Sequence, residues 1–408
     1  MKKIYSVLLF PLLFLLCGSA YENYNSTSCS GFIFPISLGK NLNCSEYAKD
    51  VKKNDEQKLH KEFNVEEGKT LNISLNTGGS ISIEGWNKNI VTADVESPRD
   101  NLDDYDIELN KTDEGIEVES DIKHDSNHNN LHFIFKVPAK FNLMIDSKGG
   151  EIKVKNVDGT INGQTMGGAL DLDNLKGDIN LKTMGGAIRL YDSEVDGKVH
   201  TMGGAVEITN VKGDVKGSTN GGSVVMKNVT SKSGKGTGNV VTVSTMGGGI
   251  DVDEAPSGAD LKTMGGSINV RSAKKFVKAR TMGGSINIEN TDGAIDAETM
   301  GGDINAEMVG DPNQGNRNVT LSSKGGDITL VVPDGLSMDI DITLAFTKNH
   351  EGDYKIYSDF PINQETTPDW SHKNGSARKY IYGKGKTGDG KNKIKIKTTN
   401  GNVYLKKG

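Results

Sequence analysis

Seven methionines recur in one motif, and their thioethers form the most regular set of potential ligands in the sequence. Each lies in a TMGG tetrapeptide, and TNGG replaces this motif once, with Asn220 in the methionine position. A column of thioethers could bind a soft metal such as Cu(I), although the interruption at Asn220 does not favour a metal ladder. It could also form an exposed apolar stripe on which a partner docks. The methionines are Met166, Met184, Met202, Met246, Met264, Met282 and Met300.

Carboxylates at outward strand positions form the second candidate set. Asp171 and Asp173, and likewise Asp251 and Asp253, resemble the paired acids of β-helical polysaccharide enzymes. Such enzymes need two acids at a fixed separation for general acid–base work. The position that matches Asp171 in the next repeat is occupied by Arg189, so acids do not accumulate from repeat to repeat. We therefore interpret these carboxylates as part of a solvated face.

Three histidines, His124, His128 and His132, are spaced four residues apart, which on a helix would align their imidazoles for a metal. The intervening DSNHNN is turn-forming and the following LHFIF is strand-like, so we interpret this stretch as a loop. The sequence contains no P-loop, GxSxG or HExxH motif, and its repeats lack the Gly-x-Asp step of a calcium β-roll. We expect no catalytic residue, no cofactor and no metal.

The motif that contains the methionines recurs every 18 residues in most places, as at Thr165, Thr183 and Thr201. SKGG at 147–150 and at 323–326 extends the series to ten corner motifs. The two long intervals contain polar inserts at residues 231–238 and 310–317, which we expect to protrude as loops. Such a series is typical of a solenoid.

Each repeat contains two short runs in which apolar and polar residues alternate, as in strands buried on one face. A repeat of this length is too short for a helical crossover, so each strand must lie parallel to its counterpart one coil further on. The sequence thus predicts an all-β fold, a single-stranded parallel β-solenoid with about 18 residues per coil. We expect it to be right-handed, like parallel crossover connections in general.

The GG pair lies where the alternation changes phase, which predicts a corner. Glycine suits a corner because it accepts positive φ or close backbone approach without steric cost. The preceding threonine is expected to form a ladder whose hydroxyls bond the next coil or a corner carbonyl. For the methionine, we favour the interpretation that it fills irregular space at the corner of a narrow core.

The N-terminal segment 1–20 has a basic start, an apolar run and small final residues, as in a secretory signal peptide. Cys17 is an alternative lipidation site, but the leucines before it are bulky, so soluble export is preferred. Cleavage would leave Cys29 and Cys44, a disulfide candidate in an oxidising compartment. The rest of the chain has no apolar stretch long enough for a transmembrane helix.

Composition agrees with a thin, elongated core, because only 34% of the residues are hydrophobic while Val, Ile and Leu are regularly spaced. The net charge is −6, and the sequence has no cluster of basic residues of the kind that binds nucleic acid. We expect five segments: the signal peptide at 1–20, a polar extension with the cysteine pair at 21–62, degenerate N-terminal coils or a cap at 63–146, the regular array at 147–335, and C-terminal strands or a cap at 336–408.

The order of these motifs resembles the DUF4097 adhesin-like family of bacterial envelope proteins. The resemblance rests on LNISLNTGGSISIEGWNKNIV, FKVPAKFNLMIDSKGGEIKV, the TMGG coils, SKGGDITLVVP and KTTNGNVYL, and it covers about residues 63–408. It implies a parallel β-solenoid with a surface or periplasmic role, and it supplies no catalytic residues.

We therefore expect an exported, non-enzymatic protein with an adhesin-like or scaffold role, binding a protein or glycan at the envelope or cell surface. The alternative is a periplasmic regulatory or envelope-stress module that binds a peptide or a membrane protein. A polysaccharide-acting enzyme is the least favoured interpretation.

Overall fold

The computed structural model describes residues 57–98, 102–123, 131–230, 240–372 and 376–408, all of which belong to one compact unit. Within these ranges the regular secondary structure is almost entirely β-strand, and the only helical elements are two short 3₁₀ turns, η1 (Leu102–Asp104) and η2 (Lys348–His350). The proposed signal peptide, Cys17 and the disulfide candidate of Cys29 and Cys44 lie outside the described residues. So does the insert at 231–238.

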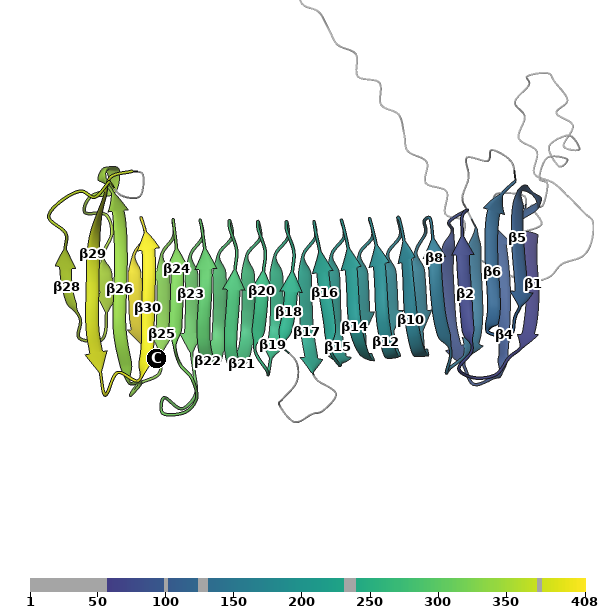
Figure 1. Ribbon diagram of the computed structural model, residues 1–408, viewed down its shortest axis with the longest axis horizontal. Helices are drawn as coiled ribbons and strands as arrows, with labels where there is room; N and C mark the ends of the chain where they lie inside the picture. The colour runs from purple at the N-terminus through teal and green to yellow at the C-terminus, as the bar shows by residue number, and fades with distance from the viewer. Residues whose placement is uncertain (1–56, 99–101, 124–130, 231–239, 373–375) are drawn as a thin grey trace, which may run out of the picture. The chain divides into compact units, whose positions relative to one another are not determined.

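The regular array consists of coils that each contribute a strand to two stacks (Figure 1). In the first stack each strand runs toward a glycine corner, which is TMGG, TNGG or SKGG. Its members are β8 (Asn142–Ser147), β10 (Asp158–Thr165), β12 (Lys176–Thr183), β14 (Glu194–Thr201), β16 (Val215–Thr219), β18 (Val241–Ser244), β20 (Ala259–Lys262) and β24 (Val319–Ser323). In the second stack each strand follows a corner, and its members are β9 (Ile152–Lys155), β11 (Leu170–Asp173), β13 (Ile188–Tyr191), β15 (Val206–Lys212), β17 (Val224–Thr230), β19 (Ile250–Ala255), β23 (Ile304–Met308) and β25 (Ile328–Val332).

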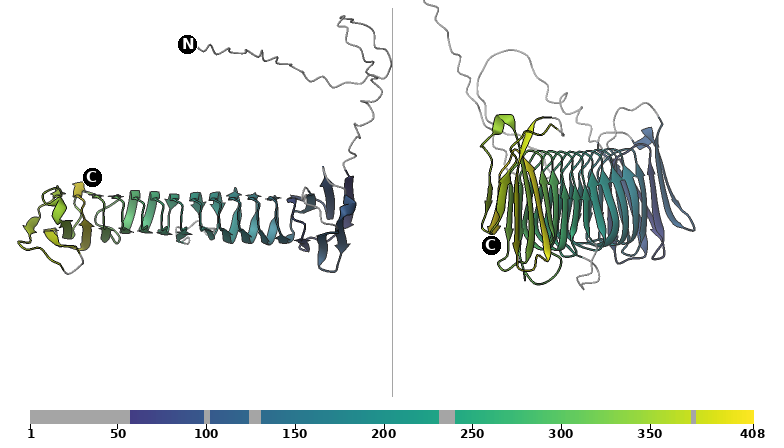
Figure 2. Two further views of the ribbon diagram at one scale, coloured as in Figure 1. Left: turned by 90° about the horizontal axis from the view of Figure 1, so that it is seen from above. Right: turned by 60° about the vertical axis from the view of Figure 1, so that its left-hand side comes forward.

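Two long strands, β21 (Ile268–Arg280) and β22 (Ile286–Thr299), contribute to both stacks. The pairings in the array are parallel and, apart from one irregularity between β22 and β23, in register, so Thr165 pairs with Thr183 and Thr183 pairs with Thr201. Figure 2 shows the same succession of coils from two further sides. The prediction of an all-β parallel solenoid with about 18 residues per coil is confirmed, whereas its right-handedness stays a prediction.

The core is the thin interior between the two stacks. In one coil Ile179 and Leu181 point inward from β12, and Ile188 and Leu190 point inward from β13, all at most 2% exposed. Full burial of such a side chain is worth about 1.5–3 kcal/mol. Each coil therefore adds a similar increment of apolar burial, which is how a chain of low hydrophobic content stays folded.

At the N-terminal end, the first coil in the sequence is not the outermost one. The strands β2 (Thr70–Leu75) and β3 (Ser80–Trp86) pair with β8 and β9 on one side, and on the other side with β6 (Gly115–Ile122) and β7 (His132–Pro138). Antiparallel pairings then cover this end, through β1 (Gln57–Asn64), β4 (Ile90–Ser97) and β5 (Tyr105–Lys111).

The C-terminal end uses the same arrangement. The final strands, β30 (Asn392–Thr399) and β31 (Val403–Lys407), lie between β24 and β25 on one side and β26 (Met338–Thr347) and β27 (Ile356–Ser358) on the other. Antiparallel pairing with β29 (Arg378–Thr387) and then β28 (Asn363–Thr366) completes this end. Irregular antiparallel layers at both ends limit open-ended addition of further strands.

The insert at 310–317 is anchored to the array by its last residue. The Arg317 side chain is buried and forms an ion pair with Asp292 at 2.6 Å. Its guanidinium also donates to the carbonyl oxygens of Val309 at 2.7 Å and Gln314 at 2.9 Å. The insert is therefore a loop, as expected, but one that is fixed to the stack at its base.

Candidate binding surface

The TMGG corner turns its threonine inward and its methionine outward. Thr183 is 2% exposed, whereas the next residue, Met184, is 47% exposed. The same holds throughout the column, where the seven methionines are between 44% and 55% exposed. The favoured prediction that methionine fills the narrow core is therefore wrong. Threonine takes the last inward position of its strand, so the following residue has the opposite parity and points to solvent.

The threonine hydroxyls fix each corner to the coil before it. Thr183 Oγ1 donates to the carbonyl oxygen of Gly168 at 2.8 Å and accepts from the amide of Gly186 at 3.3 Å. Bonds to the preceding corner repeat at Thr201, Thr219, Thr245, Thr263, Thr281 and Thr299. The predicted threonine ladder exists, and the acceptor is the corner carbonyl of the preceding coil.

The two glycines of the corner have different roles. A Cβ on Gly168 would lie 1.8 Å from the carbonyl oxygen of Gly150 in the preceding coil, a distance that no side chain tolerates. A Cβ on Gly167 would meet nothing closer than 3.9 Å. The second glycine is thus required because the backbones of adjacent coils approach each other closely, and not because it has a positive φ.

We call the exposed column the methionine stripe, and we divide it at Asn220. The first segment contains Met166, Met184 and Met202, and the second contains Met246, Met264, Met282 and Met300. Asn220 interrupts the stripe without changing the corner, because Thr219 Oγ1 still donates to Gly204 O at 2.7 Å and accepts from Gly222 N at 3.2 Å. The corner geometry therefore does not depend on methionine.

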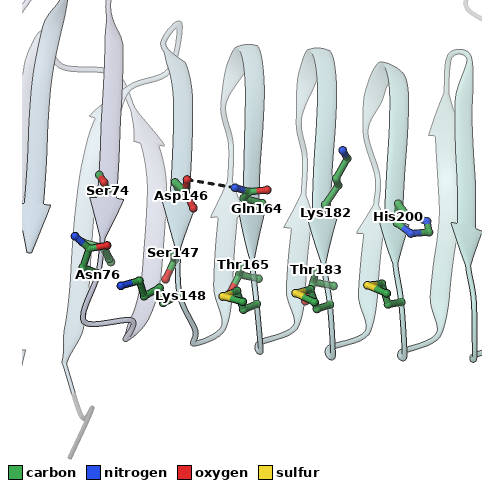
Figure 3. Close-up of a pocket in the computed structure, with 14 residues that line it drawn as sticks. Ser74, Asn76, Asp146, Ser147, Lys148, Gln164, Thr165, Lys182, Thr183 and His200 are labelled. Atoms are coloured by element: carbon green, nitrogen blue, oxygen red, sulfur yellow. Dashed lines mark hydrogen bonds between the residues drawn. The ribbon is translucent and has the colours of Figure 1, made fainter.

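A hollow of about 430 Å³ runs along the first segment (Figure 3). Its lining comes from the first stack and from the corner that follows β2, which contributes Asn76 at the N-terminal end. Besides the three methionines, its lining includes the side chains of Lys148, Lys182, His200, Gln164 and Asp146. Polar groups therefore border an apolar floor, an arrangement typical of ligand sites.

Cations beside the first segment have no acidic partner. Lys182 precedes the corner threonine directly, and Lys198 and Lys216 lie two residues further back on the same outward face. Within the part of the chain that the structure describes, none of the three has a carboxylate oxygen within 4.0 Å. His200 Nδ1 forms a hydrogen bond with Ser218 Oγ at 2.9 Å.

Two cations beside the second segment are paired, whereas Lys278 has no carboxylate oxygen within 4.0 Å among the described residues. Lys262 lies 3.8 Å from Asp260, and Arg280 lies 2.9 Å from Asp296 and 3.5 Å from Glu298. The two segments thus share their methionines and differ in the cation directly before the corner threonine, which is unpaired at Lys182 and paired at Lys262 and Arg280. The sequence analysis missed the cations beside the stripe. They could have been found, because the residue before each corner threonine has the same outward parity as the methionine.

The candidate carboxylates lie on the second stack, and cations or amides of neighbouring coils hold them. Asp171 accepts from Arg189 at 3.1 Å, and this hydrogen bond raises the pKa of the guanidinium. Asp173 lies 3.6 Å from Lys155. These contacts agree with a solvated, ion-paired face.

The second pair of acids has the same kind of neighbours. Asp251 accepts from Asn269 at 2.6 Å, and Asp253 accepts from Arg271, whose pKa the hydrogen bond raises. Across the described ranges no three His, Cys, Asp or Glu side chains form a group that could hold a metal ion. His132 forms a hydrogen bond with Ser80 Oγ at 2.5 Å, while His124 and His128 lie outside those ranges.

Comparison with known families now adds to this geometry. The family model described as Toastrack DUF4097 matches residues 204–406. This part of the chain belongs to the DUF4097 family. The match covers the second segment of the methionine stripe and the C-terminal strands, and over these residues the resemblance inferred from the sequence is confirmed.

Two solved structures are similar to the chain over 86% of its length. One is a candidate cell adhesion protein from Clostridium sporogenes, with 13% identity, a TM-score of 0.19 and 100% of its own chain covered. The other is a candidate adhesin from Bacteroides fragilis, with 10% identity, a TM-score of 0.21 and 97% of its chain covered. A comparison with curated proteins gives no significant match. At these identities and TM-scores, neither likeness carries an argument about what this chain binds.

Among the described residues, no helix has the length and apolarity needed to cross a membrane.

Proposed function

We propose that this protein is an exported, non-enzymatic binding protein with an adhesin-like or scaffold role at the bacterial cell envelope, and that the methionine stripe is its binding surface. The observation that carries the proposal is the exposure of all seven methionines in one straight, in-register column. Its partner is a protein or glycan of the envelope or cell surface.

The stripe is suited to binding because of its length and its chemistry. It spans eight coils, and at about 4.8 Å per coil this is roughly 35 Å. Contiguous apolar surface is costly to leave in water and marks interaction sites. Methionine adapts its shape to different partners because its side chain is unbranched and polarizable.

Export is supported by the signal-like segment at 1–20. An adhesin-like role agrees with the family match. A non-enzymatic role agrees with the carboxylates that are individually paired rather than clustered.

Asn220 suggests the variant that tests the proposal, because asparagine already occupies one corner without disturbing it. The chain from residue 21 onward would be used to capture partners from glycans, matrix proteins and envelope extracts. A variant in which six methionines are changed to asparagine, three in each segment, is expected to keep its β-sheet circular dichroism and to lose the captured partner. Equal capture by the folded variant would contradict the stripe as the binding surface.

A further inference from the structure

We propose that the hollow along the first segment binds a single-chain anionic amphiphile, an acyl chain with a carboxylate or phosphate head. This rests on the proposed function, because it assigns a ligand class to one part of the same stripe. The acyl chain lies along Met166, Met184 and Met202, and the anionic head lies among the neighbouring lysines.

The floor of the hollow is apolar and follows the direction of stacking. The three methionines are one coil apart, and the lining extends to Asn76 in the corner after β2. A narrow floor of this kind matches one extended hydrocarbon chain better than a wide, branched group. The flexible thioethers can close around the chain and exclude water from it.

The charge beside the floor is complementary to an anion. Lys148 and Lys182 line the hollow and have no carboxylate within 4.0 Å among the described residues. Asp146 is the only carboxylate in the lining, and its Oδ2 accepts a hydrogen bond from Gln164 at 3.2 Å. An unpaired ammonium group at the rim of an apolar groove favours an anionic head over a neutral or cationic one.

Apart from Asp146, the acidic residues named on this face lie at the other end of the strands. Asp178, Asp196 and Asp214 each lie five residues before the corner threonine of their coil. The strand length therefore separates these three acids from the methionines, and Lys198 and Lys216 lie between the two.

An extended peptide fits this site less well, because the backbone donors at the corners are already used. The amide of Met184 donates to Thr165 O at 3.1 Å, and the amide of Met202 donates to Thr183 O at 3.2 Å. The amide of Gly203 donates to Met184 O at 2.9 Å. A peptide that docks by strand addition needs free main-chain groups, whereas an acyl chain needs none.

The test is calorimetric titration of the full chain with three dodecyl probes that differ only in the head: dodecanoate, dodecyl maltoside and dodecyltrimethylammonium, all below their critical micelle concentrations. Dodecanoate is expected to bind saturably and more tightly than the other two. Changing Met166, Met184 and Met202 to asparagine is expected to weaken it at least about tenfold, because three apolar contacts are lost. Lys148→Gln with Lys182→Gln is expected to weaken dodecanoate by about two- to fivefold and to leave the maltoside unchanged.

The matched control changes Met246, Met264 and Met282 to asparagine, and it is expected to bind dodecanoate like the unchanged chain. Several results would overturn the proposal: no saturable binding, equal affinity for all three heads, an equal loss with the control variant, or binding to anionic vesicles but not to free dodecanoate. Failure here is distinguishable from failure of the proposed function, because capture of an envelope partner by the stripe would persist without any affinity for dodecanoate.

Discussion

The two halves of the array, residues 147–230 and 240–332, build the same glycine corner and differ at the opposite corner of each coil. In the first half the chain turns there through a residue with positive φ, and these residues are Asn156, Asn174, Asp192, Asn210 and Asn228. In the second half the corresponding residues Glu254, Ser272 and Asn290 lie within β19, β21 and β22 and have no positive φ, although Lys275, three residues after Ser272, does. The glycine corner therefore recurs in both halves. The opposite corner has a left-handed residue at this position in the first half and none in the second.

Steric crowding explains why the glycine corner is the same in both halves while the opposite corner varies. At the glycine corner a Cβ on the second glycine would overlap the carbonyl of the preceding coil, so no side chain fits. At the opposite corner side chains point outward, and asparagine can take the left-handed conformation at low cost. There it also links coils, since Asn174 Nδ2 donates to Asn156 Oδ1 at 2.7 Å and Asn228 Nδ2 donates to Asn210 Oδ1 at 2.9 Å.

The largest loss of stability is expected from substitutions at the glycine corner, which both halves share. Gly168→Ala is expected to destabilise the protein by at least about 3 kcal/mol, because its Cβ would overlap a backbone carbonyl that cannot move alone. Gly167→Ala, which meets nothing closer than 3.9 Å, is expected to cost far less. The pair Gly302→Ala and Gly301→Ala should repeat this contrast in the second half. Urea unfolding followed by circular dichroism measures all four, and equal costs within a pair would refute the explanation.

A smaller effect tests the corner that differs. Asn210→Ala is expected to cost about 1–2 kcal/mol, since alanine must then adopt the left-handed conformation. Asn290 occupies the corresponding place in the second half within the continuous strand β22, so Asn290→Ala is expected to change stability by less than about 0.5 kcal/mol. Asn210→Gly should recover most of the loss. A large cost at Asn290 would show that both halves depend on this position equally.

The smallest effect on stability tests the charge difference between the two segments of the stripe. Asp296→Asn with Glu298→Gln frees Arg280 from both of its acidic partners and makes the second segment resemble the first. Stability should change by less than about 1 kcal/mol, because these ion pairs are well exposed. A second dodecanoate site is expected to appear in calorimetry. Its absence would show that the hollow of the first segment, and not its charge, decides binding.

The sequence predicted the solenoid because its evidence is periodic and local. The constant interval between corners, the alternation on each side of GG and the shortness of each unit leave one arrangement, parallel strands stacked coil on coil. The threonine ladder followed from the same register. The absence of an acidic cluster could also be read directly, because in-register stacking places Asp171 beside Arg189.

Only the tertiary structure decided the direction of the methionines and the order of the outer coils. Alternation breaks at the corner itself, so the inward or outward position of Met184 depends on which residue ends the strand, and Thr183 takes that place. Likewise, β2–β3 and β30–β31 lie inside the stack although they are first and last among the coils. Period and pattern specify how a coil is built, whereas the neighbour on which it stacks is settled by long-range pairing between strands distant in sequence.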